Sequence, residues 1–173
     1  MHVTILQLTD SPKPGLYHFT ADDVAGMHDD KFPDGVTEHT GETRQDDINT
    51  LLDMLGEAVT GKGVESADGR STEWIDVDTH AAKLQPVFRT AFEEAQKAIS
   101  QLSVMTLADF ATGDNRIAGA MYRLKAAYGF DNVYIMDAGG DCTAVSEWLR
   151  DLAYVEGGHV VRYYIHATYD GDQ

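Results

Sequence analysis

Two periods of hydrophobic and polar residues run along this chain, and each period predicts one type of secondary structure. Apolar residues recur every three or four positions over residues 43–61, 114–129 and 140–157. This spacing is typical of amphipathic helices, and each of these segments ends at a glycine that favours a helix stop. The strongest stripe spans residues 84–102, with Pro86 in its first turn. A helix at the centre of the core is expected there.

β-forming residues predict a second set of elements. Strands are expected over residues 2–8, 16–19, 73–77, 132–138 and 160–169. Side chains in the last of these strands alternate between two sets along its whole length, so one face of the strand should be buried and the other partly exposed to solvent.

The segments between these elements contain turn and capping signals. Thr20 and Asp23 have the spacing of a capping box, which predicts a short helical turn over residues 20–28. Residues 29–41 and 61–71 are rich in glycine or proline and are expected to be loops.

This order of elements predicts an α+β fold, with a mixed β-sheet of about four to five strands and three to four helices packed mainly on one face. The final strand–helix–strand unit suggests a right-handed parallel crossover. No internal repeat or linker rich in Pro, Gly or Ser is visible. Residues 1–173 are therefore expected to form a single globular domain.

Cysteine content and hydropathy bear on the cellular compartment. Cys142 is the only cysteine, so no internal disulfide can form and a reducing environment is expected. The N-terminus lacks the basic start and apolar run of a signal peptide, and no apolar run is long enough to span a membrane. These features predict a cytoplasmic location without membrane association.

Charge is the most unusual property of the sequence. The chain carries 29 acidic and 13 basic residues, for a formal net charge of −16. Solubility, high internal salt in the host and binding of a basic partner each explain such a balance. Direct binding to DNA, RNA or an anionic membrane is disfavoured under all three explanations, because such binding rests on Lys and Arg.

The negative charge is concentrated between residues 10 and 47, where ten acidic residues stand against three basic ones. If a partner binds through acidic contacts, this segment should supply them. The expected contact residues are Asp22, Asp23, Asp29, Asp30, Asp46 and Asp47.

A second candidate site is the turn between the strand at 132–138 and the helix that follows. A ligand turn there would use Asp137, Gly139, Gly140, Asp141 and Cys142. A helix N-terminus at this place would offer free amides and stabilise a thiolate. The two aspartates would oppose both effects, so a tight turn with Asp141 as the N-cap is the favoured interpretation.

The chain contains no G-x-S-x-G, H-E-x-x-H, P-loop or EF-hand pattern. No catalytic residue, metal site or cofactor is therefore assigned. The leading hypothesis is a non-enzymatic acidic module that binds another protein with a basic surface, such as an inhibitor or nucleic-acid mimic from a virus or mobile element. The alternatives are a structural subunit of a viral or other large assembly, which would self-associate, and a small enzyme that uses the turn at residues 137–143.

Overall fold

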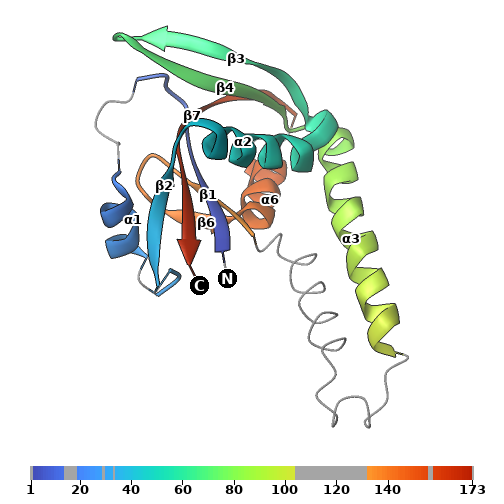
Figure 1. Cartoon of the computed structure of the whole chain (residues 1–173). Helices are drawn as coiled ribbons and strands as arrows, with labels where there is room; N and C mark the ends of the chain where they lie inside the picture. The colour runs from blue at the N-terminus through green and yellow to red at the C-terminus, as the bar shows by residue number, and fades with distance from the viewer. Residues whose placement is uncertain are drawn as a thin grey trace.

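The computed structural model describes residues 2–13, 19–28, 30–32, 34–103, 132–155 and 158–172. Across these ranges the chain forms an α+β fold built on one seven-stranded mixed sheet (Figure 1). The predicted fold class is confirmed. The expected number of strands, four to five, is too low, because the sheet has seven.

The strands follow an order in space that differs from their order in the sequence. They are β1 (His2–Thr9), β2 (Gly35–His39), β3 (Val59–Ala67), β4 (Arg70–Asp78), β5 (Val133–Met136), β6 (Cys142–Ala144) and β7 (Val160–Asp172). The order across the sheet is β3-β4-β7-β1-β5-β6, and β2 also pairs with β7. The long strand β7 receives β4 along residues 160–165 and β2 along residues 168–172.

The direction of the last strand differs from the prediction. β5 runs parallel to β1, whereas β7 runs antiparallel to β1 on its other side. The final strand–helix–strand unit therefore joins two strands that run in opposite directions and are not neighbours. The expected parallel crossover is wrong, because β5 and β7 run in opposite directions, on either side of β1.

Four α-helices lie in the described ranges: α1 (Ala21–Met27), α2 (Gly41–Leu55), α3 (Ala81–Ser103) and α6 (Val145–Val155). A short 3-10 turn, η1 (Gly56–Ala58), follows α2. The predicted capping box before α1 is confirmed, because the Thr20 hydroxyl accepts the Asp23 amide at 3.2 Å and the Asp23 carboxylate accepts the Thr20 amide at 2.8 Å. The helix predicted over residues 43–61 begins two residues earlier, after Thr40 in an extended conformation. Its predicted stop at Gly61 is wrong, because α2 ends at Leu55 and Gly61 lies in β3.

Apolar side chains cover both faces of the sheet. On one face, α2, α3 and α6 pack against strand residues that include Leu6 and Ile165. On the other face, α1 supplies Val24 to a smaller cluster that contains Ile5 and Tyr169. The sheet is thus a central layer with most of the helical mass on one side.

The helix α3 contributes to the core mainly through its N-terminal turns. Leu84 and Val87 are buried, but Phe92 is 63% exposed. Figure 1 shows the C-terminal part of α3 extending beyond the sheet. The expectation that the whole stripe over residues 84–102 lies in the core is therefore wrong for Phe92.

A β-bulge in β7 corrects a second prediction. Gln7 and Leu8 are consecutive in β1, but they pair with Ala167 and Ile165, so His166 is an extra residue in β7. An extra residue reverses which face the following side chains occupy. As a result Ile165 lies in one core and Ala167 in the other, and the predicted alternation does not continue through the strand.

Three strands, β2, β3 and β6, were not predicted. β2 lies in the segment 29–41, which was expected to be a loop. β3 covers the last residues of the predicted helix over 43–61 and most of the segment 61–71, which was expected to be a loop. Residues 16–18 of the strand predicted over residues 16–19 lie outside the described ranges. All residues of the helix predicted over residues 114–129 also lie outside them.

Candidate functional site

Most of the carboxylates that were expected to contact a partner are exposed to solvent. We define the acidic surface as the seven exposed carboxylates on α1, β2, the turn between them and the start of α2. These are Asp22, Asp23, Asp30, Asp34, Glu38, Glu42 and Asp46. Four of the six predicted contact residues belong to it.

Two of these elements lie close together. α1 and β2 are neighbours, and α2 begins where β2 ends (Figure 1). α2 packs on the opposite face of the sheet from α1, so the acidic surface includes carboxylates from both sides of the sheet, on either side of β2. Burial raises the pKa of Tyr169, and the carboxylates of Glu38 from β2 and Asp23 from α1 raise it further. Both carboxylates therefore act on the same phenol, whose hydroxyl donates to the Phe19 carbonyl at 2.7 Å.

The basic residues of this region point inward. Lys31 is half-buried and donates its Nζ hydrogen to the Cys142 carbonyl at 2.7 Å. Arg44 is also half-buried, pairs with Glu73 and donates to the Ile165 carbonyl at 3.0 Å. Among the described residues between 19 and 47 these are the Lys and Arg side chains, and the contacts given for them are not with the carboxylates of the acidic surface.

Two predicted contact residues do not join this surface. Asp47 is only 7% exposed, and its carboxylate lies 2.8 Å from Nδ1 of His39. It therefore ties α2 to the end of β2 and is not available to a partner. Asp29 lies outside the described residues.

The turn at residues 137–143 is held by its own aspartate. The Asp137 carboxylate accepts the Gly139 amide at 2.8 Å and the Asp141 amide at 2.9 Å. His28 Nε2 lies 2.7 Å from the Gly140 carbonyl and joins the turn to the end of α1. These amides are already used, so the turn offers little to an anionic ligand.

Cys142 does not lie at a helix N-terminus. It begins β6, and α6 starts only at Val145, so the expected N-cap role of Asp141 is wrong. The Cys142 side chain is 5% exposed, and this burial raises the pKa of its thiol to about 12. A thiol with such a pKa is not a thiolate nucleophile at neutral pH.

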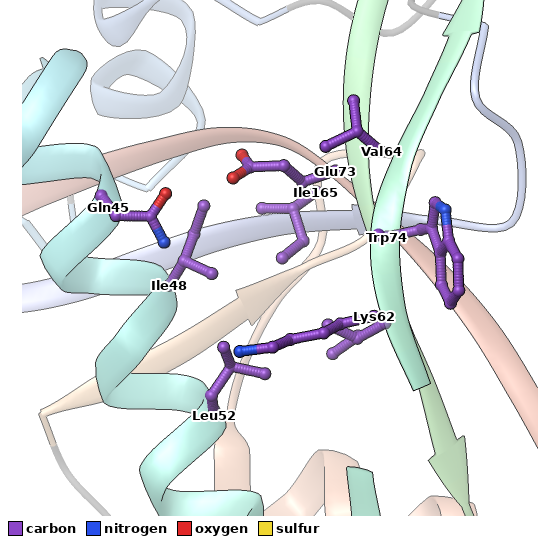
Figure 2. A pocket seen from close by; sticks show the side chains of 10 residues that line it. Gln45, Ile48, Leu52, Lys62, Val64, Glu73, Trp74 and Ile165 are labelled. Carbon is purple, nitrogen blue, oxygen red and sulfur yellow. The ribbon is translucent and has the colours of Figure 1, made fainter. Parts of the chain in front are cut away.

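A groove that the sequence did not indicate lies between α2 and the β3–β4 hairpin. Its volume is about 320 Å³ (Figure 2). Its apolar lining includes Ile48 and Leu52 from α2, Ile75 from β4 and Ile165 from β7. The groove forms because α2 crosses the sheet without covering β3 completely.

Side chains of β3 form the outer wall of the groove. Lys62 and Val64 point to the α2 side of the sheet, and Figure 2 shows the Lys62 ammonium directed across the groove toward Leu52. Val64 is 63% exposed. Both residues lie in the segment that was expected to be a loop, where their spacing of two residues was the available signal for a strand.

The opposite face of the hairpin explains how β3 is held in place. The Trp74 ring packs over Gly61 and Gly63, and the guanidinium carbon of Arg162 lies 3.7 Å from the ring centroid. Arg162 also donates two hydrogen bonds to Asp76, at 2.7 and 2.8 Å. These hydrogen bonds lower the pKa of Asp76.

Within the described residues, no group of three or more His, Cys, Asp or Glu side chains is placed to hold a metal ion. None of the described helices is long and apolar enough to cross a membrane. No protein family model, curated protein or solved structure matches this chain.

Proposed function

We propose that this protein is a non-enzymatic module that binds another protein, and that its acidic surface attracts a partner with a basic surface. The observation that carries this proposal is the inward orientation of Lys31 and Arg44. It turns the Lys and Arg side chains of the described residues 19–47 away from the seven exposed carboxylates on adjoining elements.

Such a surface acts mainly on the rate of association. A charge of one sign over part of a protein's surface speeds the encounter with an oppositely charged partner by about 10- to 1000-fold at low salt. The attraction weakens as salt shortens the Debye length to about 8 Å at physiological ionic strength. Salt dependence and location on the surface are therefore the properties to test.

The test compares two variants with the same net charge. The first neutralises four members of the acidic surface by Asp30→Asn, Asp34→Asn, Glu38→Gln and Asp46→Asn. These four are exposed, and the capping residues of α1 remain intact. The control neutralises four exposed carboxylates elsewhere by Asp68→Asn, Glu93→Gln, Glu147→Gln and Asp151→Asn.

The wild-type protein is used to capture a partner from a lysate of its source cells, with stepwise elution by salt. Association rates of the identified partner are then measured with both variants between low and physiological salt. We expect the first variant to associate about three- to tenfold more slowly at low salt, with a flatter salt dependence, and the control to change little. Equal slowing in both variants would show that only net charge matters and would refute the role of this surface.

A further inference from the structure

The groove between α2 and the β3–β4 hairpin adjoins a sheet edge. β3 pairs with β4 on one side, and in the described part of the chain no strand pairs with its other side. An unpaired strand of nine residues presents a row of backbone donors and acceptors to which an extended chain can add. This edge and the groove belong to the same strand, so one ligand can use both.

The chemistry of the groove restricts what such a ligand carries. Its floor is aliphatic, and the largely exposed Val64 side chain stands at its border. Burial of an apolar side chain against these residues is favourable by roughly 1.5–3 kcal/mol when it is complete. The ligand should therefore place an aliphatic side chain over Val64.

The charge of the groove is opposite to that of the protein as a whole. The Glu73 carboxylate is already paired with Arg44. Lys62 has no ion-pair partner among the described residues, so its ammonium is an uncompensated positive charge beside an apolar floor. A carboxylate side chain is the group that complements it.

The spacing of these two requirements follows from strand geometry. Lys62 and Val64 are two residues apart and point to the same face of β3. Residues two apart on an added strand also share a face and lie opposite such a pair. We infer that this edge binds an extended peptide segment of a partner protein, in which an Asp or Glu and an aliphatic residue are separated by one residue.

This inference concerns a different surface from the acidic one and does not depend on the proposed electrostatic role. A second copy of the chain is a poorer occupant, because each copy carries a net charge of −16. The experiment nevertheless has to distinguish self-association through β3 from peptide binding.

The probes are synthetic nine-residue peptides of threonine with a central Asp-Thr-Leu or Leu-Thr-Asp triplet, because the added strand can run in either direction. Matched peptides replace Asp by Asn or Lys, or replace Leu by Ser. Binding is measured by fluorescence anisotropy up to millimolar peptide, and hydrogen exchange of the β3 amides locates the site.

The protein variants are Lys62→Glu and Val64→Ser. Their controls are Lys97→Glu on α3, which makes the same change in charge, and Val160→Ser, which alters another exposed valine. Because Lys62 and Val64 are exposed, both variants are expected to fold, and circular dichroism checks this.

We expect one of the two Asp peptides to bind with protection of the β3 amides. Lys62→Glu should weaken the binding of that peptide by roughly three- to tenfold and strengthen the binding of the Lys peptide. Lys97→Glu should change neither affinity. Val64→Ser and the Leu-to-Ser peptide should each weaken binding by about tenfold. Equal binding of the Asp, Asn and Lys peptides, no binding at millimolar peptide, or dimers of the protein that Val64→Ser dissociates would each overturn the inference.

Discussion

The packing of Trp74 over the glycines of β3 gives a prediction that tests how the hairpin is held. In Gly63→Ala, the new Cβ would lie 2.7 Å from Cζ2 and 2.9 Å from Cε2 of the Trp74 ring. Both distances are shorter than carbon atoms tolerate, so the ring or the strand has to move. The Arg162 guanidinium, which stacks on the same ring, restricts that movement.

The expected magnitude combines two opposing effects. Overpacking a well-packed site costs about 1–3 kcal/mol. Replacing glycine by alanine within a strand returns about 0.5–1 kcal/mol, because the unfolded chain loses freedom. The net effect of Gly63→Ala should be a loss of up to about 2.5 kcal/mol in the free energy of unfolding.

Equilibrium unfolding in urea measures this difference, and a second glycine provides the matched control. Gly26 lies within α1 with no atom within 4 Å of the position of a Cβ. Gly26→Ala should therefore stabilise the protein, by up to about 1 kcal/mol. If Gly63→Ala stabilises the protein as much as Gly26→Ala does, the close packing of Trp74 on β3 is refuted.

Three further predictions concern burial, charge and capping. The Cys142 thiol, with its pKa raised from 9.0 to about 12, should react with alkylating reagents at pH 8 roughly a thousandfold more slowly than in the unfolded chain. Its proton is retained only in the folded state between these values, so stability should fall as pH rises from 9 to 12. Asp76→Asn should reduce the loss of stability on acidification, because the lowered pKa of Asp76 stabilises the fold above its unfolded pKa and this contribution disappears as pH falls. Thr20→Ala should cost about 1 kcal/mol in urea unfolding, and Thr20→Ser should restore most of it.

The strands that were predicted correctly can be recognised from their own residues. β1 and β5 are short runs of β-forming residues, and most of their side chains are buried. β3 has the opposite character, with Gly61 and Gly63 in its centre. Those glycines are required by Trp74 on the neighbouring strand, which the local sequence cannot show.

The faces and directions of strands depend on partners that are distant in the sequence. The alternation in β7 is regular in the sequence, yet the bulge at His166 moves Ala167 to the opposite core from Ile165. The bulge exists because of the pairing with β1, which is more than 150 residues away. The same pairing places β1 between β5 and β7 and removes the expected parallel crossover.

The candidate sites also differ in how far the local sequence predicts them. Exposure of Asp30 and Asp46 follows from composition, because unpaired charges remain in water. Asp47 departs from this rule because His39 lies beside it. The groove was not predictable, because it needs a helix and an edge strand that come together only in the folded sheet.

The two proposed surfaces should act on different steps of binding. The acidic surface acts at long range, so its neutralisation should change the association rate and the salt dependence. The groove acts only in contact, so Lys62→Glu and Val64→Ser should mainly raise the dissociation rate. A single partner that bound both surfaces would have a basic surface and an extended segment in which a carboxylate and an aliphatic residue are separated by one residue. The carboxylate would bind Lys62 on a protein whose net charge of −16 repels most acidic peptides, and this repulsion would make the groove selective for peptides that fit it.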